Sequence, residues 1–202
     1  MERKRKVSLK EINHLRILCL KNAGELIEEA ELLLKAKRYP RAFVLSEIAL
    51  EELAKIPMLV GYVNRDVNKL PSREEFSKRW SNHINKKIVA GIMSGIPTTE
   101  LGVSAIAANH YKNFGLYVDL TKKGPVMPRN LIGKGLARSS YTIALITYKK
   151  LLRSEKIIGS IGEEHLKLFK TPEFKKIMSD AVNSEEGLKN LLKIVQEFWS
   201  VI

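Results

Sequence analysis

Hydrophobic side chains recur every three or four residues over most of the chain, with charged residues between them. This spacing predicts amphipathic helices over 9–36, 41–63, 73–93, 98–110 and 131–156. Pro57 lies inside the second segment, where we expect it to kink the helix or to end its regular part near Ile56. The stretch GLYVDL, 115–120, is short, aromatic and β-branched, a pattern typical of extended backbone.

These elements predict an all-α antiparallel helical bundle with a short extended segment and extra C-terminal helices. We expect the bundle to span 7–158. A helical extension, 159–202, is expected to pack on the same domain. No stretch of about 18 uncharged apolar residues exists, so we expect no membrane span and no membrane partner. Cys19 is the single cysteine, which excludes a disulfide framework and favours the cytoplasm.

The net charge of +13 indicates an anionic partner, with nucleic acid and anionic membrane surfaces as the two obvious classes. Because the lysines are spread along the whole chain, the same charge also fits colloidal solubility or the lysine-rich composition of thermophile proteins. Charge alone leaves these interpretations open.

A line of ionisable residues marks the apolar stretch SEIALEELAK, 46–55. Glu47, Glu51 and Lys55 share one narrow stripe of the predicted helix. Two carboxylates four residues apart repel each other unless a cation, a proton or a metal lies between them. In the simplest structural interpretation Lys55 pairs with Glu51, and an arginine from a neighbouring helix pairs with Glu47. The functional interpretations are a metal site or a polar pocket.

Basic residues surround a histidine in RWSNHINKK, 79–87. Arg79, His83 and Lys87 are spaced i, i+4, i+8, and Lys86 borders their face. Flanking cations disfavour the charged form of a histidine, so we expect a neutral imidazole that can act as a general base while the cations hold a phosphate. A solvated basic face with one incidental histidine is the plainer interpretation.

The extended stretch GLYVDL places Tyr117 and Asp119 on one side of the chain. Asp119 is a candidate acceptor for a lysine or for His83, and Tyr117 is a candidate for stacking on a base. Ordinary docking of a loop onto the bundle explains the same pattern. We expect one polar cluster between the second and third helices, formed by the following residues: Glu47, Glu51, Lys55, His83, Lys86 and Asp119.

The order of NAGELIEEAELLLKAKRYPRA, SEIALEELAK, HINKK and GLYVDL resembles the AbiV family of abortive-infection proteins, over 21–152. That family is grouped with the HEPN superfamily of helical bundles. The resemblance implies phage defence, a homodimer, and an action on RNA or the translation machinery. Many HEPN members are ribonucleases with an Arg-x(4–6)-His motif. Here Arg79 and His83 have only three residues between them, and Lys78 holds the permitted spacing.

The leading hypothesis is therefore a phage-defence protein that acts on RNA or on a ribosome-associated target, with a phage protein as a further candidate partner. If it cleaves RNA, the catalytic candidates are His83, Glu51 and Arg79, and Lys87 is a second cation for the phosphate. This hypothesis assigns no cofactor and no metal ligand. The alternatives are a helical module that binds RNA or protein without catalysis, and a metal-dependent hydrolase that uses Glu47, Glu51 and His83.

Overall fold

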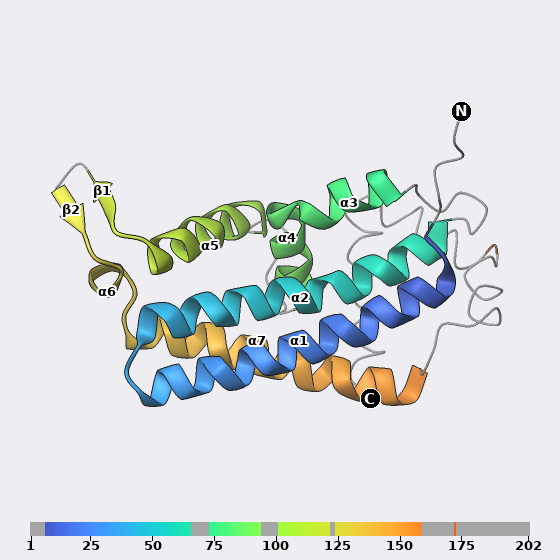
Figure 1. The fold of residues 1–202 in the computed structure, drawn as a ribbon, viewed down its shortest axis with the longest axis horizontal. Helices are drawn as coiled ribbons and strands as arrows, with labels where there is room; N and C mark the ends of the chain where they lie inside the picture. Colours follow the sequence, from blue (N-terminus) through green and yellow to red (C-terminus); the bar gives the residue numbers. More distant parts are fainter. Residues whose placement is uncertain (1–6, 66–72, 94–100, 122–123, 159–171, 173–202) are drawn as a thin grey trace.

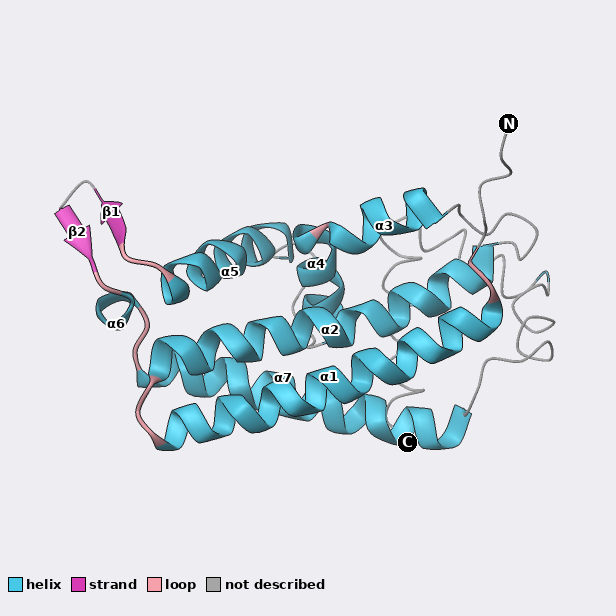
Figure 2. Cartoon of the chain, viewed as in Figure 1, coloured by secondary structure: helices cyan, strands magenta, loops and turns pink. Residues whose placement is uncertain are grey.

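A computed structural model describes residues 7–65, 73–93, 101–121, 124–158 and residue 172 of the chain. The elements in chain order are α1 (Leu9–Lys35), α2 (Tyr39–Arg65), α3 (Arg73–Ser81), α4 (His83–Met93), α5 (Leu101–Leu116), β1 (Asp119–Thr121), β2 (Gly124–Val126), α6 (Pro128–Leu131) and α7 (Lys134–Ile158). Helix predominates, and β1 and β2 form one short hairpin (Figure 2). The predicted all-α bundle is confirmed. The predicted C-terminal helices lie outside the described residues, apart from residue 172.

The helix α2 is the centre of the bundle. It contacts α1 and α7 on one side and α4 and α5 on the other (Figure 1). Its apolar side chains are therefore buried nearly all round, including Phe43, Leu50, Leu53 and Leu59. This position explains why its sequence is apolar on almost every face, and it makes α2 the scaffold on which polar groups from several helices meet.

Pro57 does not end α2, and this part of the prediction is wrong. The helix continues through Pro57 to Arg65. A proline inside a helix costs about 3 kcal/mol because it removes a hydrogen bond and crowds the preceding turn. Leu53, Ile56 and Leu59 are buried on either side of it. Each buried side chain of this size contributes about 1.5–3 kcal/mol, which outweighs the cost of the proline.

The single helix predicted over 73–93 is in fact two helices. α3 ends at Ser81 and α4 begins at His83, so the i, i+4 spacing of Arg79 and His83 does not place them on one helical face. The first backbone hydrogen bond of α4 runs from the Lys86 N–H to the Asn82 carbonyl, at 3.3 Å. Asparagine is favoured at helix starts, which explains why the chain interrupts the helix there.

The stretch GLYVDL is only partly extended. Gly115 and Leu116 still belong to α5, and the extended backbone begins further on, with β1 at Asp119. The chain continues through β2 and the short α6 to α7. β1 and β2 pair in antiparallel register, with Asp119 opposite Val126. The hairpin projects from one end of the bundle (Figure 1).

Close approach between helices explains the glycine that opens GLYVDL. A Cβ atom on Gly115 would lie 2.5 Å from Cγ2 of Val44, 3.0 Å from Cδ1 of Ile132 and 3.2 Å from the carbonyl oxygen of Pro40. α5 therefore reaches the start of α2 and the segment after α6 only because residue 115 has no side chain.

The variant Gly115→Ala should lower the free energy of unfolding by about 1–3 kcal/mol, the usual cost of overpacking a tight core. Urea unfolding followed by circular dichroism measures this change. Gly133→Ala is the matched control, because a Cβ atom there meets nothing within 4 Å. Equal stability of the Gly115→Ala variant and the unchanged protein would contradict the packing argument.

The single cysteine, Cys19, is buried in the core. Burial, reinforced by the charge of Glu52, raises the pKa of its thiol to about 12, so the thiol is unreactive.

Within the described ranges, no helix is both long enough and apolar enough to cross a membrane.

Candidate functional site

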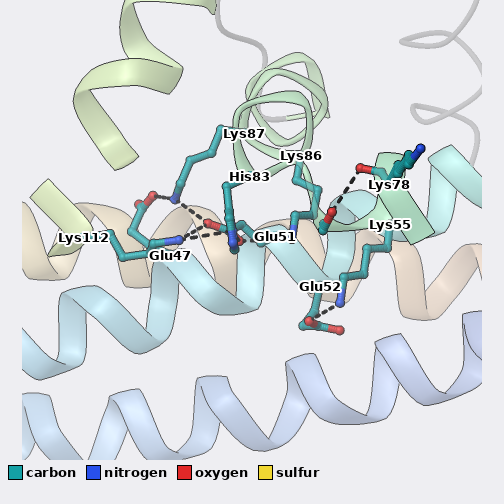
Figure 3. A network of polar contacts seen from close by, with 10 residues as sticks. Glu47, Glu51, Glu52, Lys55, Lys78, His83, Lys86, Lys87 and Lys112 are labelled. Atoms are coloured by element: carbon teal, nitrogen blue, oxygen red, sulfur yellow. Dashed lines mark hydrogen bonds and ion pairs between the residues drawn. The ribbon is translucent and has the colours of Figure 1, made fainter. Parts of the chain in front are cut away.

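Polar side chains from four helices, all but one of them buried, meet beside the middle of α2. This polar cluster consists of Glu47, Glu51, His83, Lys86, Lys87, Lys112 and Ser140. Figure 3 shows His83, Lys86 and Lys87 reaching from α4 toward the two glutamates, and Lys112 approaching from α5. The repulsion expected between Glu47 and Glu51 is offset in the cluster, because lysines from neighbouring helices lie beside both carboxylates.

Glu47 is held by two partners on different helices. Lys87 forms an ion pair and a hydrogen bond with Oε2. The Ser140 hydroxyl on α7 donates to Oε1 at 2.7 Å. All three side chains are buried. Glu47 therefore ties both α4 and α7 to α2, and both of its carboxylate oxygens are satisfied inside the protein.

Glu51 is the centre of the cluster, with a side chain only 5% exposed. Its Oε1 accepts a hydrogen bond from Lys112 Nζ at 2.7 Å and lies 3.5 Å from Lys87 Nζ. Its Oε2 lies 2.6 Å from His83 Nδ1 and 3.5 Å from Lys86 Nζ. One carboxylate thus gathers three lysines and a histidine around it.

The surroundings keep Glu51 ionised. Burial raises the pKa of this carboxyl. Hydrogen bonds from Lys112 and His83, together with the charges of Lys87 and Lys112, lower it by more, so that the resulting pKa is about 2. An ionised carboxylate only accepts hydrogen bonds, so the proton in the contact with His83 must lie on Nδ1. We assign this tautomer from the contact. The lone pair of the neutral ring is then on Nε2.

His83 is the member of the cluster that meets solvent. Its side chain is 56% exposed, whereas the side chains of Glu51, Lys86, Lys87 and Lys112 are at most 10% exposed. Among the described residues, no partner of Nε2 is found. The buried carboxylate therefore fixes the orientation of an imidazole whose basic nitrogen lies on the outer side of the cluster.

Cationic groups outnumber anionic ones in the cluster. Three ammonium groups face two carboxylates before His83 is counted. Burial lowers the pKa of Lys86, and the charge of Glu51 offsets part of that effect. The excess positive charge lies beneath the exposed His83, which makes the surface around this side chain attractive to an anion.

Three predicted site residues, Lys55, Asp119 and Tyr117, are not part of this cluster within the described part of the structure. Lys55 pairs with Glu52 rather than Glu51, and its Nζ lies 4.8 Å from the centre of the Trp80 ring. Asp119 is exposed in β1, and its Oδ1 accepts from the N–H of Leu120 at 2.7 Å; among the described residues it contacts neither a lysine nor His83. Tyr117 is exposed beyond the end of α5. The side chain of Arg79 lies outside the described part of the structure.

Lys112 and Ser140 were not among the residues that the sequence singled out. Lys112 is the only Lys, Arg, Asp or Glu in the otherwise weakly polar stretch 101–116, and a lone charge there favours a buried partner. Ser140 belongs to a buried stripe of small residues on α7 with Ala137, Ala144 and Thr147. The spacing of that stripe identifies the face of α7 that meets α2. Both patterns can be recognised in the local sequence, but neither identifies the residue that the side chain contacts.

The cluster does not resemble a metal centre. Among the residues that the structure describes, no group of three His, Cys, Asp or Glu side chains is arranged to hold a metal ion. Each oxygen of Glu51 already has an ammonium group within 3.5 Å, so a cation at this carboxylate would have to displace a lysine. The donor set therefore argues against the metal-hydrolase alternative.

Comparison with known proteins identifies the family. The HEPN-type family model described as AbiV matches residues 11–148, a stretch that contains every residue of the polar cluster. Neither the curated proteins nor the solved structures gave a significant match to the chain. The match covers about two thirds of the sequence and the same order of motifs that carries the resemblance. Membership of this family points to abortive infection, a form of phage defence. On this match, the chain belongs to the AbiV family of HEPN-type proteins.

Proposed function

We propose that this protein acts in phage defence by cleaving RNA, with His83 as the general base. The observation that carries the proposal is the contact between Glu51 and His83: a buried carboxylate holds Nδ1 at 2.6 Å while the ring lies at the surface. A carboxylate that fixes the tautomer of a histidine and stabilises the imidazolium is the arrangement used in general-base catalysis.

In the proposed reaction, Nε2 of His83 accepts the proton of a ribose 2′-hydroxyl. The 2′-oxygen forms a bond to the neighbouring phosphorus, and the bond from phosphorus to the 5′-oxygen breaks. The departing oxygen takes a proton from solvent, and the products carry a 2′,3′-cyclic phosphate and a 5′-hydroxyl. Glu51 acts as a positioning residue, because it touches His83 rather than the substrate. The lysines around it favour the negative charge that develops on phosphate.

A second candidate function is binding without cleavage. Lys87 is bound to Glu47 inside the bundle, and Lys112 is bound to Glu51, so neither ammonium group lies free at the surface to hold a phosphate directly. This observation favours a module that recognises RNA or a ribosome-associated component and inhibits it by occupying it. It shares the family assignment with the first candidate but needs no base.

Purified protein should cleave a mixed-sequence RNA, and His83→Ala should slow cleavage by at least about 100-fold, the lower range for losing a general base. Gel analysis of end-labelled RNA measures the rate, and treatment with a phosphatase distinguishes a cyclic phosphate from an open one. His14→Ala is the matched control, because His14 is an exposed histidine on α1 outside the cluster. This control should cleave at the unchanged rate.

Equal rates for His83→Ala and the unchanged protein would reject His83 as the base. If the unchanged protein binds RNA in a salt-sensitive manner but does not cleave it, the binding module is the correct candidate. His83→Ala should then still protect cells in a phage-resistance assay, whereas the ribonuclease proposal requires that protection be lost.

The family resemblance extends this proposal to assembly and location. We propose a cytoplasmic homodimer whose target is RNA or a ribosome-associated component, with a phage protein as a further candidate partner. Light scattering on the purified chain distinguishes a dimer from a monomer.

A further inference from the structure

From a group of exposed cations at one end of the bundle, we infer a surface that binds the phosphate backbone of single-stranded RNA. This inference rests on the proposed function in one respect, because both take RNA as the target. The surface, here called the basic end, consists of Lys37, Arg38, Arg41, Arg129, Lys134 and Arg138, and all six are exposed. It is separate from the polar cluster, whose lysines are buried in ion pairs.

The charge at the basic end is strongly one-sided. Among the described residues of 36–46 and 115–138, Asp119 is the only acidic side chain. None of the six cations forms an ion pair within the described part of the chain. Within that part their charges are therefore not neutralised, in contrast to Lys35, which pairs with Glu31 at 2.7 Å just before this region.

The fold brings these cations together from segments far apart in the sequence. The turn between α1 and α2, the short α6 and the start of α7 lie at the same end of the molecule (Figure 1). Phe43, Val44, Ile132 and Ala137 form one buried core there, with Leu34 packed against it. Because this core fixes the three segments relative to each other, the cations around it form a defined surface rather than a flexible tail.

The backbone of the turn is itself fixed. The Arg38 N–H donates to the Leu33 carbonyl at 2.8 Å and the Lys37 N–H to the Leu34 carbonyl at 3.1 Å, the hydrogen bonds of a Schellman motif. Lys37 holds the left-handed position of this motif, with φ 58°, where glycine is the usual residue. The chain therefore has a cation at a position that the fold would fill more easily with glycine.

The basic end continues toward His83. Arg41 precedes Glu47 by six residues on α2, or about 9 Å along the helix axis. Lys112 precedes the end of α5 by four residues, or about 6 Å. Tyr117, which follows directly, is 66% exposed and offers a ring on which a base can stack. A flexible polyanion with bases fits this arrangement, because one strand can contact the cations, the ring and His83 in turn.

The test measures binding separately from cleavage by using His83→Ala protein throughout. The probe is a fluorescein-labelled mixed-sequence RNA of 12 nucleotides, followed by anisotropy over a series of salt concentrations. One variant carries Lys37→Asn, Arg38→Gln and Arg41→Gln, because asparagine tolerates the left-handed backbone. The matched control carries Lys21→Gln, Lys149→Gln and Arg153→Gln, which removes the same charge from exposed positions outside the basic end.

We expect the basic-end variant to bind at least tenfold more weakly at about 0.1 M salt. The slope of log affinity against log salt should fall by about 2, since each phosphate contact to a single strand contributes about 0.7. The control should change affinity less than twofold. A second variant, Arg129→Gln with Lys134→Gln and Arg138→Gln, tests the other half of the surface, and circular dichroism checks that each variant folds before its binding is compared.

Equal losses in the basic-end and control variants would overturn the inference, because the effect would then be net charge alone. Unchanged binding in both basic-end variants would also overturn it. So would binding to phosphatidylserine vesicles that depends on the same residues without any RNA binding. The two proposals fail separately: absent cleavage by the unchanged protein rejects the ribonuclease, whereas RNA binding that is independent of these residues rejects the basic end.

Discussion

Replacing Glu51 with glutamine should lower the free energy of unfolding by about 3–5 kcal/mol, the range for removing one partner of a buried ion pair. The variant keeps the size of the side chain but removes its charge. Lys112 then lacks the carboxylate that it contacts at 2.7 Å, and Lys86 lacks the only carboxylate that an ion pair gives it among the described residues. A buried ammonium group without a counter-charge is the source of the loss.

Urea unfolding at pH 7 measures this effect. Glu25→Gln is the matched control, because Glu25 is 59% exposed and its contact to Lys21 is 3.9 Å long, so the expected change is about 0.5 kcal/mol or less. The double variant Glu51→Gln with Lys112→Met should recover part of the stability, since it removes one of the ammonium groups that Glu51→Gln leaves unpaired. A loss no larger than that of Glu25→Gln would contradict the description of the cluster.

The same carboxylate makes stability depend on pH. The folded pKa of Glu51, about 2, lies below its ordinary value of 4.5. Its contribution is therefore fully present above pH 4.5 and is lost as the pH falls through about 2, for a total of about 3 kcal/mol. Glu51→Gln should flatten this part of the stability curve. If the stability of Glu51→Gln falls between pH 4.5 and about 2 as steeply as that of the unchanged protein, Glu51 is not the source of this pH dependence.

Replacing Arg16 with methionine should cost about 3–5 kcal/mol for a similar reason at a different place. Arg16 is 2% exposed on α1, and its Nη2 and Nε lie 2.5 and 3.1 Å from Oε1 of Glu155 near the end of α7. Its Nη1 donates to Asn13 at 2.9 Å. The pair ties the first helix of the bundle to the last, and the variant leaves Glu155 without this arginine.

The matched control is Lys35→Met, which breaks an ion pair on the same helix between side chains that are 68% and 46% exposed. Its expected cost is far smaller than that of Arg16→Met, because an ion pair between exposed side chains is screened by solvent and contributes little. The double variant Arg16→Met with Glu155→Leu separates the cost of an unpaired charge from lost packing, because it removes both partners. It should be more stable than Arg16→Met alone, and the opposite order would show that packing dominates.

The fold was largely predictable because apolar residues recur at helical spacing over long stretches of the chain. The spacing of apolar residues placed α1 and α2 within two residues at each end. The errors arose where tertiary contacts override local preference. Pro57 stays helical because buried neighbours hold it, and GLYVDL begins in a helix because Gly115 fits against Val44.

The glutamates of the candidate site and the basic residues around His83 could be predicted from the sequence, but which of these side chains pair with each other could not. Sequence spacing joined Glu51 to His83 only as a hypothesis, and it paired Glu51 with Lys55 because i, i+4 neighbours on a helix are close. In the structure Lys55 pairs with Glu52, and Lys112 reaches Glu51 from 61 residues away. The expected neutrality of His83 rested on flanking cations and did not include the carboxylate beside its ring.

The break at Asn82 changes what the interval between Arg79 and His83 means. Inside one helix, each added residue would rotate everything after it by about 100° and move His83 away from Glu51. At a connection between two helices, one or two extra residues lengthen the connection and leave the packing of α4 in place. In this chain the three residues between Arg79 and His83 thus include the connection between α3 and α4, so the interval sets the length of that connection rather than a rotation along one helix.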